Sequence, residues 1–133
     1  MSESLESILV VDDDSSVRET LRQVLKDRGY QVTLAKNGDE ALERLREQEY
    51  CLVLTDLRMP GMQGIELMRK IRRAYPDVGV IIMTAYGTID TAIEAMSHGA
   101  ADYLIKPFAP EELFRVTERA RRETSVRHKA IKE

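Results

Sequence analysis

Five short apolar runs, separated by stretches of helical periodicity, constrain the fold of this chain more than any other feature. They span residues 8–11, 31–35, 51–55, 80–83 and 102–105. The first, third and fourth are almost continuously apolar and rich in β-branched residues, which is typical of strands buried on both faces. The second alternates between polar and apolar residues, which favours an edge strand.

Amphipathic patterns with helix-ending signals fill the gaps between these runs. They cover residues 17–25, 41–45, 65–71, 88–97 and 110–122. The first closes at Gly29, and the last begins at a proline suited to a first helical turn. Five strand–helix units in succession predict an α/β fold, with a doubly wound parallel sheet, right-handed crossovers and helices on both faces.

Composition excludes several classes of protein. A chain of 133 residues fits one domain. Its single cysteine, Cys51, opens a predicted buried strand and excludes an internal disulfide or a cysteine-based zinc site. The net charge of −3 does not favour direct nucleic-acid binding. The sequence lacks both a membrane-length apolar run and a signal peptide, so we expect no membrane association and a cytoplasmic protein.

Polar side chains follow four of the five predicted strands, at the point where each strand ends. They are Asp12, Asp13 and Asp14 after the first, Asp56 after the third, Thr84 after the fourth and Lys106 after the fifth. In an open α/β sheet, ligands bind beyond the carboxyl ends of the strands, near the point where the strand order reverses. We therefore expect these side chains to converge at one edge of the sheet.

Carboxylates that converge at one place repel each other unless a cation lies between them. Mg²⁺ prefers oxygen ligands and commonly takes one or two carboxylates while leaving positions for phosphate. The charges of Asp12, Asp13 and Asp56 would be balanced by Mg²⁺ and Lys106, which leaves a site able to accept a phosphoryl group. Taken singly, each residue also has an ordinary interpretation, such as a helix N-cap for the Asp14 segment.

Four stretches of the sequence, residues 8–14, 54–62, 82–85 and 102–108, together resemble the receiver domain of two-component response regulators. The resemblance covers about residues 6–122. Residues 83–92 are most similar to receivers attached to AAA+ transcriptional activators of the NtrC type. The resemblance implies a flavodoxin-like (CheY-like) fold with five helices and a five-stranded sheet in the order 2-1-3-4-5.

The resemblance also implies a role for each acidic residue. Asp56 would be the phosphoacceptor that attacks the phosphohistidine of a sensor histidine kinase. Asp12 and Asp13 would form the acidic pocket, with Asp13, Asp56 and the backbone carbonyl of Arg58 as direct ligands of Mg²⁺. Lys106 would hold a phosphoryl oxygen.

Switching and tuning roles follow from the same resemblance. Thr84 and Tyr103 would form the switch pair, and their movement would reshape the face made by the fourth helix, fifth strand and fifth helix. Arg58 and Tyr86 would tune the lifetime of the phosphoryl group. The peptide bond at 106–107 would be cis.

The resemblance implies a receiver domain over residues 1–122. Residues 123–133 would be a helical linker, or the start of a connection to an output domain, AAA+ and DNA-binding, that controls transcription. A homodimer formed through this linker is a further expected partner. The chain would catalyse only its own phosphorylation and dephosphorylation, and is therefore not expected to be an enzyme.

Two alternatives remain open. The first is a stand-alone receiver that binds a partner protein directly. The second is a phosphatase of the haloacid dehalogenase type, in which Asp12 would be the nucleophile and Asp14 the acid/base. One departure from the family is Gln63, which stands where many members have Asp and predicts a weaker cap on the third helix.

Overall fold

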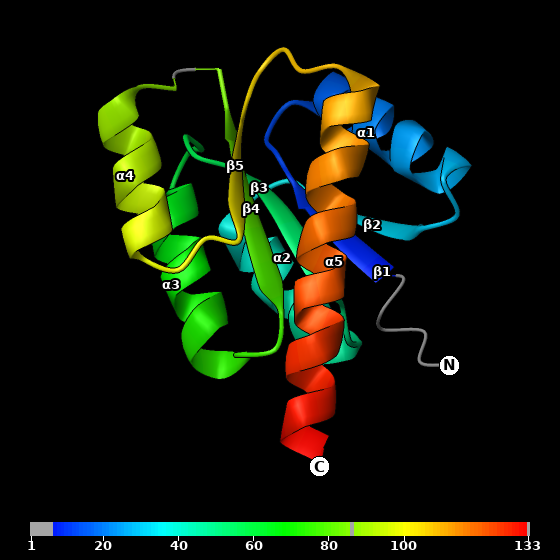
Figure 1. Cartoon of the computed structure of the whole chain (residues 1–133). Helices are drawn as coiled ribbons and strands as arrows, with labels where there is room; N and C mark the ends of the chain where they lie inside the picture. The colour runs from blue at the N-terminus through cyan, green and yellow to red at the C-terminus, as the bar shows by residue number, and fades with distance from the viewer. Residues whose placement is uncertain (1–6, 86, 133) are drawn as a thin grey trace.

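A computed structural model describes residues 7–85 and 87–132, with side chains up to residue 123 (Figure 1). Strands and helices alternate along these residues as the apolar runs predict. The strands are β1 Ser7–Val11, β2 Gln31–Ala35, β3 Leu52–Asp56, β4 Gly79–Thr84 and β5 Asp102–Ile105. The helices are α1 Ser15–Asp27, α2 Gly38–Glu47, α3 Gly64–Ala74, α4 Ile89–Ser97 and α5 Pro110–Lys132.

The five strands form one parallel sheet in the order β2-β1-β3-β4-β5. This is the predicted order, and it places β2 at an edge as its alternating sequence indicates. The chain moves from β1 outward to β2, then returns past β1 to β3. The strand order therefore reverses between β1 and β3, where a doubly wound sheet opens a crevice at its carboxyl edge.

Helices cover both faces of the sheet, with α1 and α5 on one face and α2, α3 and α4 on the other (Figure 1). Successive residues of β1 point to opposite faces. Leu9 and Val11 belong to the core cluster under α2, α3 and α4, whereas Ile8 and Val10 belong to the cluster under α1 and α5. All four side chains are fully buried, which explains why this run is continuously apolar.

Local signals set most helix ends. Asp14 is the N-cap of α1 and accepts a hydrogen bond of 2.9 Å from the Ser16 amide. Gly29 adopts a φ of 96° just after this helix, a conformation that glycine takes most easily. Helix α5 continues to Lys132, so it runs unbroken from the predicted fifth helix into the residues expected to form a helical linker. Residues 111–132 contain neither glycine nor proline, so no local signal stops the helix.

The described residues bear on two further features of the sequence, the single cysteine and the length of its apolar segments. Cys51 directly precedes β3 and is buried. None of the described helices is both long enough and apolar enough to cross a lipid bilayer. The linker and output domain expected beyond residue 122 stay predictions.

Candidate functional site

Four strands deliver polar side chains to one edge of the sheet. Asp12 directly follows β1, Asp56 is the last residue of β3, Thr84 is the last of β4, and Lys106 directly follows β5. Because the strands are parallel, these four carboxyl ends lie at the same edge of the sheet. The structure therefore brings together the residues that the strand-end pattern selected.

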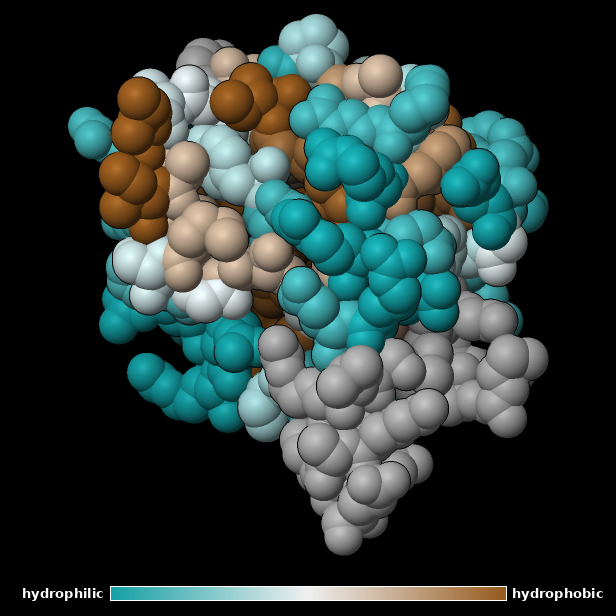
Figure 2. Space-filling view, in the orientation of Figure 1, coloured by the Kyte–Doolittle hydropathy of each residue, from teal (hydrophilic) through white to brown (hydrophobic). Residues whose placement is uncertain are grey.

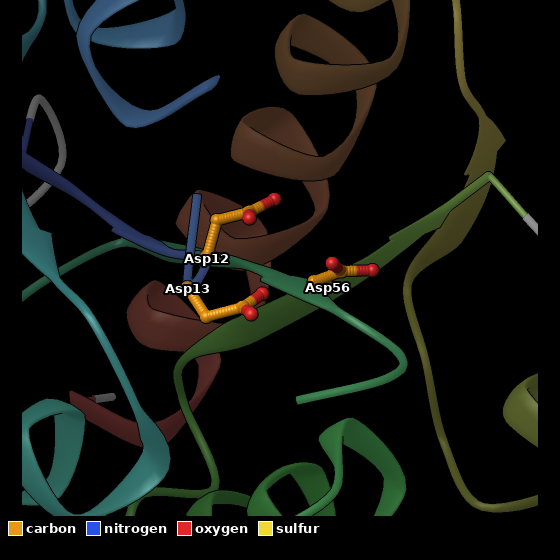
Figure 3. Close-up of side chains that lie close together, drawn as sticks. All are labelled: Asp12, Asp13 and Asp56. Atoms are coloured by element: carbon orange, nitrogen blue, oxygen red, sulfur yellow. The ribbon is translucent and has the colours of Figure 1, made fainter. Parts of the chain in front are cut away.

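Three carboxylates meet at the crevice between β1 and β3. Figure 3 shows the side chains of Asp12, Asp13 and Asp56 directed into one space, and one oxygen from each lies within 4.8 Å of the others. Asp12 is only 1% exposed, Asp56 is half-buried and Asp13 faces solvent. The Asp14 amide donates a hydrogen bond of 2.9 Å to Asp12 Oδ1, which fixes the orientation of the buried carboxylate.

The Lys106 ammonium lies against two of these carboxylates. Its Nζ donates to Asp12 Oδ2 at 2.6 Å and to Asp56 Oδ2 at 3.4 Å. Burial on its own would lower the pKa of Lys106, but the hydrogen bonds and charges of Asp12 and Asp56 outweigh burial and raise it. Lys106 is therefore a fixed positive charge in this site at neutral pH.

The environment of Asp56 destabilises the ionised form of its carboxylate. Burial, the largest influence, raises the pKa of Asp56 above its ordinary value. The charge of Lys106 lowers this pKa, while the charge of Asp12 raises it further. A site that destabilises the ionised form of Asp56 favours whatever brings additional positive charge to it.

The donor set fits a hard divalent cation. One ammonium offsets only one of three carboxylates, and all the available donors are oxygens, the ligands that Mg²⁺ prefers. Mg²⁺ holds its ligands at about 2.1 Å and usually retains several waters. Carboxylates within 4.8 Å of one another are close enough to share such an ion directly or through one of its waters.

Thr84 and Tyr103 lie on the neighbouring strands β4 and β5. Thr84 is fully buried, and its backbone carbonyl accepts a hydrogen bond of 2.8 Å from the Lys106 amide. Tyr103 is half-buried and packs against the core cluster beneath α3 and α4. Its hydroxyl lies 2.7 Å from Thr91 Oγ1 on α4, so the ring bridges the sheet and that helix.

The two residues expected to tune the phosphoryl lifetime are placed less completely. Arg58 lies on the loop after β3, two residues beyond Asp56, with an exposed side chain. Tyr86 lies outside the described residues. Their tuning roles stay predictions. The peptide bond between Lys106 and Pro107 is cis, as the sequence resemblance implied.

Two residues beside this site were not singled out from the sequence. A Cβ on Gly64 would come within 2.2 Å of the Asp56 carbonyl oxygen, so the first turn of α3 packs directly against the end of β3. Glycine is a poor residue for a first helical turn, and that mismatch was the available signal. Arg18 donates to the Asp12 carbonyl oxygen at 2.7 Å, and no local pattern foretells this contact.

Comparisons with known proteins agree with this geometry. A protein-family model described as "Response regulator receiver domain" matches residues 8–118. The transcriptional regulatory protein ZraR of Klebsiella oxytoca is 50% identical over 113 residues, which cover 85% of this chain and 26% of ZraR. The DNA-binding transcriptional regulator NtrC of Escherichia coli K12 is 44% identical over 113 residues, covering 85% of this chain and 24% of NtrC.

A solved structure extends the comparison to three dimensions. The solution structure titled as the beryllofluoride-activated NtrC4 receiver domain dimer superimposes with a TM-score of 0.85 at 33% identity. The match covers 90% of this chain and 98% of that one. By contrast, the chain spans about a quarter of the length of the two curated relatives, at 26% and 24%.

Proposed function

The chain belongs to the response regulator receiver domain family, and from this premise we propose that Asp56 is its phosphoacceptor. It is a receiver domain related to the transcriptional regulators ZraR and NtrC. One observation carries the proposal: the Lys106 ammonium lies between the carboxylates of Asp12 and Asp56 at the crevice where the strand order reverses. The donor would be the phosphohistidine of a sensor histidine kinase, and we place the reaction in the cytoplasm.

The proposed reaction is a phosphoryl transfer in which one bond to phosphorus forms and one breaks. A carboxylate oxygen of Asp56 forms the new bond to phosphorus, and the bond from phosphorus to the donor imidazole breaks. The imidazole leaves with the electron pair and takes up a proton. Asp56 becomes an acyl phosphate, and its charge changes from −1 to about −2. Lys106 already donates hydrogen bonds to the carboxylates of Asp12 and Asp56. It is therefore placed to donate a hydrogen bond to a phosphoryl oxygen as negative charge develops there.

Mg²⁺ is the proposed cofactor of this step. Asp12, Asp13, Asp56 and the backbone carbonyl of Arg58 would hold it. When bound, the ion supplies positive charge for the phosphoryl oxygens. The proposed catalysis is confined to the domain's own phosphorylation and to its dephosphorylation, in which water attacks phosphorus, Asp56 is regenerated and inorganic phosphate leaves. The protein would therefore act as a switch rather than as an enzyme that turns over a separate substrate.

The proposed output surface is an exposed apolar patch, which we call the α4–β5 patch. It consists of Ile89, Ile93, Met96 and Ile105, whose exposed fractions are 79%, 61%, 49% and 52%. Figure 2 shows strongly hydrophobic residues gathered on this side of the molecule, over α4. A cluster of exposed large apolar side chains is typical of a protein-contact surface.

We propose that this patch, with α5, passes the signal to an output domain in the same chain, AAA+ and DNA-binding. The two relatives are named as transcriptional regulators and are about four times as long as their matched regions, which supports this output. A homodimer that buries the same face is a related proposal, since the NtrC4 receiver structure is titled a dimer. A stand-alone receiver would use the same chemistry and differ only in its partner.

Mapping the phosphorylated residue tests the proposal. The wild-type chain, treated with acetyl phosphate and Mg²⁺, should gain one phosphoryl group that borohydride trapping locates at Asp56. Asp56→Asn should lose this adduct. Asp12→Asn should form it more slowly but at the same residue, because Asp12 is proposed to hold the ion. An adduct trapped on Asp12 in the wild-type chain would instead support the phosphatase alternative and overturn the proposal.

A further inference from the structure

The hydroxyl of Tyr103 has a partner that the proposed switch pair does not include. Thr91 lies in the first turn of α4, and its Oγ1 is 2.7 Å from the Tyr103 hydroxyl. The tyrosine ring is half-buried and packs against the core cluster under α2, α3 and α4. Its hydroxyl is therefore held at the end of a packed side chain. This bond connects β5 to the N-terminus of α4.

The same Thr91 hydroxyl is part of the cap that begins α4. The Thr88 amide donates to Thr91 Oγ1 at 2.9 Å, and the Thr91 amide donates to Thr88 Oγ1 at 3.1 Å. These two bonds form a reciprocal capping box. One oxygen atom of Thr91 therefore serves both the helix cap and Tyr103.

The capacity of a hydroxyl group limits how Thr91 can satisfy these neighbours. A threonine hydroxyl has one hydrogen and two acceptor lone pairs. Its hydrogen can reach the Thr88 carbonyl oxygen, 3.0 Å away, while its lone pairs accept from the Thr88 amide and the Tyr103 hydroxyl. The Thr88 hydroxyl, at 3.2 Å, is a longer-range competitor for the lone pair that Tyr103 occupies. Displacement of Tyr103 thus rearranges the hydrogen bonds of the cap.

Gly87, in the loop before α4, lies close to the Tyr103 hydroxyl. A Cβ added to Gly87 would lie 3.3 Å from that hydroxyl oxygen and 2.7 Å from Ile105 Cγ1. The Gly87 backbone is therefore packed closely against both β5 side chains, and Ile105 belongs to the α4–β5 patch. A movement of Tyr103 has to be shared with this loop and with the first turn of α4.

We propose that Thr91 is a positioning residue that couples Tyr103 to the N-terminal cap of α4. The stability of the first turn of α4 then depends on where Tyr103 lies. Helix α4 fully buries only Ala95, so few core contacts hold this helix in addition to its N-terminal cap. This inference deepens the proposed function: it names how the switch tyrosine would act on the patch-bearing helix.

Amide hydrogen exchange in α4, measured by NMR without any phosphoryl donor, tests the coupling. The amides to follow are those of Thr91 and Ala92, which bond to Thr88 Oγ1 and to the Thr88 carbonyl. We expect Tyr103→Phe and Thr91→Val each to speed their exchange about three- to tenfold. The double variant should exchange no faster than Thr91→Val alone. Thr91→Ser keeps the hydroxyl and should restore a near wild-type rate.

A matched control separates this coupling from simple loss of the cap. Thr88→Ala removes one cap oxygen and leaves the Thr91–Tyr103 pair in place. In this background Tyr103→Phe should still speed exchange of the Ala92 amide, because the contact between Tyr103 and Thr91 is retained. The inference is overturned if Tyr103→Phe leaves α4 exchange unchanged. It is also overturned if the effects of Thr91→Val and Tyr103→Phe multiply, because Thr91 would then act on the cap alone.

The inference and the proposed function fail in different ways. If no phosphoryl group forms on Asp56, the proposed function is wrong. The amide exchange of the single and double variants is measured without phosphorylation, so it tests the coupling of Thr91 to Tyr103 independently of that result. With Mg²⁺ and beryllofluoride, wild-type α4 exchange should change, and Thr91→Val should show less than half of that change at equal ligand occupancy. A change of the same size in both proteins would overturn the coupling.

Discussion

Helices α3 and α4 cover the same face of the sheet, yet they are held to it in different ways. Helix α3 buries Leu67, Met68 and Ile71 completely within the core. Helix α4 has comparable apolar content but fully buries only Ala95, and its large apolar side chains form most of the exposed α4–β5 patch. Helix α3 is held by its core contacts, whereas α4 exposes most of its large apolar side chains to solvent.

Their N-terminal caps show the reverse pattern. Gln63, the N-cap of α3, makes no side-chain cap bond. Its side-chain Nε2 donates instead to the Met59 carbonyl oxygen at 3.0 Å. Helix α4 begins with the complete capping box of Thr88 and Thr91. Segments with few buried apolar contacts open at low free energy, and moving elements are drawn from them. We infer from this comparison that α4 opens at a lower free energy than α3.

The largest expected difference in the free energy of unfolding is between truncation of a buried isoleucine in α3 and truncation of an exposed isoleucine in α4. Ile71→Ala should lower the free energy of unfolding by about 2–5 kcal/mol, because it leaves a cavity in a fully buried cluster. Ile93→Ala should change it by no more than about 0.5 kcal/mol, since that side chain is 61% exposed. Urea unfolding monitored by circular dichroism measures both. Equal losses would refute the contrast between the two helices.

A second prediction concerns the strand ends that lead into these helices, Asp56 before α3 and Thr84 before α4. Burial above all raises the pKa of Asp56 from its ordinary value of 3.8, so the folded chain holds that proton more tightly than the unfolded chain does. The contribution of Asp56 to stability is therefore fully present below about pH 4 and is lost as pH rises through the folded value. At neutral pH, its ionised carboxylate opposes folding.

Asp56→Asn should accordingly raise the free energy of unfolding at pH 7 and lose this advantage on acidification below about pH 4. The gain should be smaller than the loss caused by Ile71→Ala. Thr84→Val, which alters no charge, should show an effect on stability that does not vary over the same range. Thermal unfolding at a series of pH values compares the two. A benefit of Asp56→Asn that grows as the pH falls would contradict the assigned direction of the pKa shift.

The elements that the sequence predicts best are those governed by one repeated rule. Buried parallel strands need continuous apolar runs, so the five strands follow from the pattern, as does the distinction between the central strands β1, β3 and β4 and the edge strand β2. Parallel strands also place their carboxyl ends together, so the convergence of Asp12, Asp56, Thr84 and Lys106 follows from strand positions alone.

The contacts that the sequence does not predict depend on three-dimensional approach between elements. The Thr91–Tyr103 bond joins α4 to β5, and no periodicity specifies which hydroxyl a tyrosine will meet. The close packing of Gly64 against Asp56 likewise depends on how α3 docks on the sheet. The continuation of α5 to Lys132 needs no such contact, because residues 111–132 contain no helix-breaking glycine or proline.

The smallest expected effect sharpens the contrast between the two caps. Gln63→Ser supplies a side-chain oxygen for the uncapped amides of α3, and it should raise the global free energy of unfolding by about 0.5–1 kcal/mol. Thr88→Ala removes a similar bond from α4. Because α4 contributes little buried surface, we expect this loss to appear mainly as local opening of α4.

Two measurements on the same pair of variants distinguish local from global effects. Urea unfolding should register Gln63→Ser as a gain and Thr88→Ala as a change of less than about 0.5 kcal/mol. Amide exchange in α4 should respond to Thr88→Ala by about three- to tenfold and not to Gln63→Ser. A loss of about 1 kcal/mol in global stability from Thr88→Ala would mean that α4 unfolds together with the core. A helix coupled so tightly to the core could not move separately from α3, and the comparison would fail.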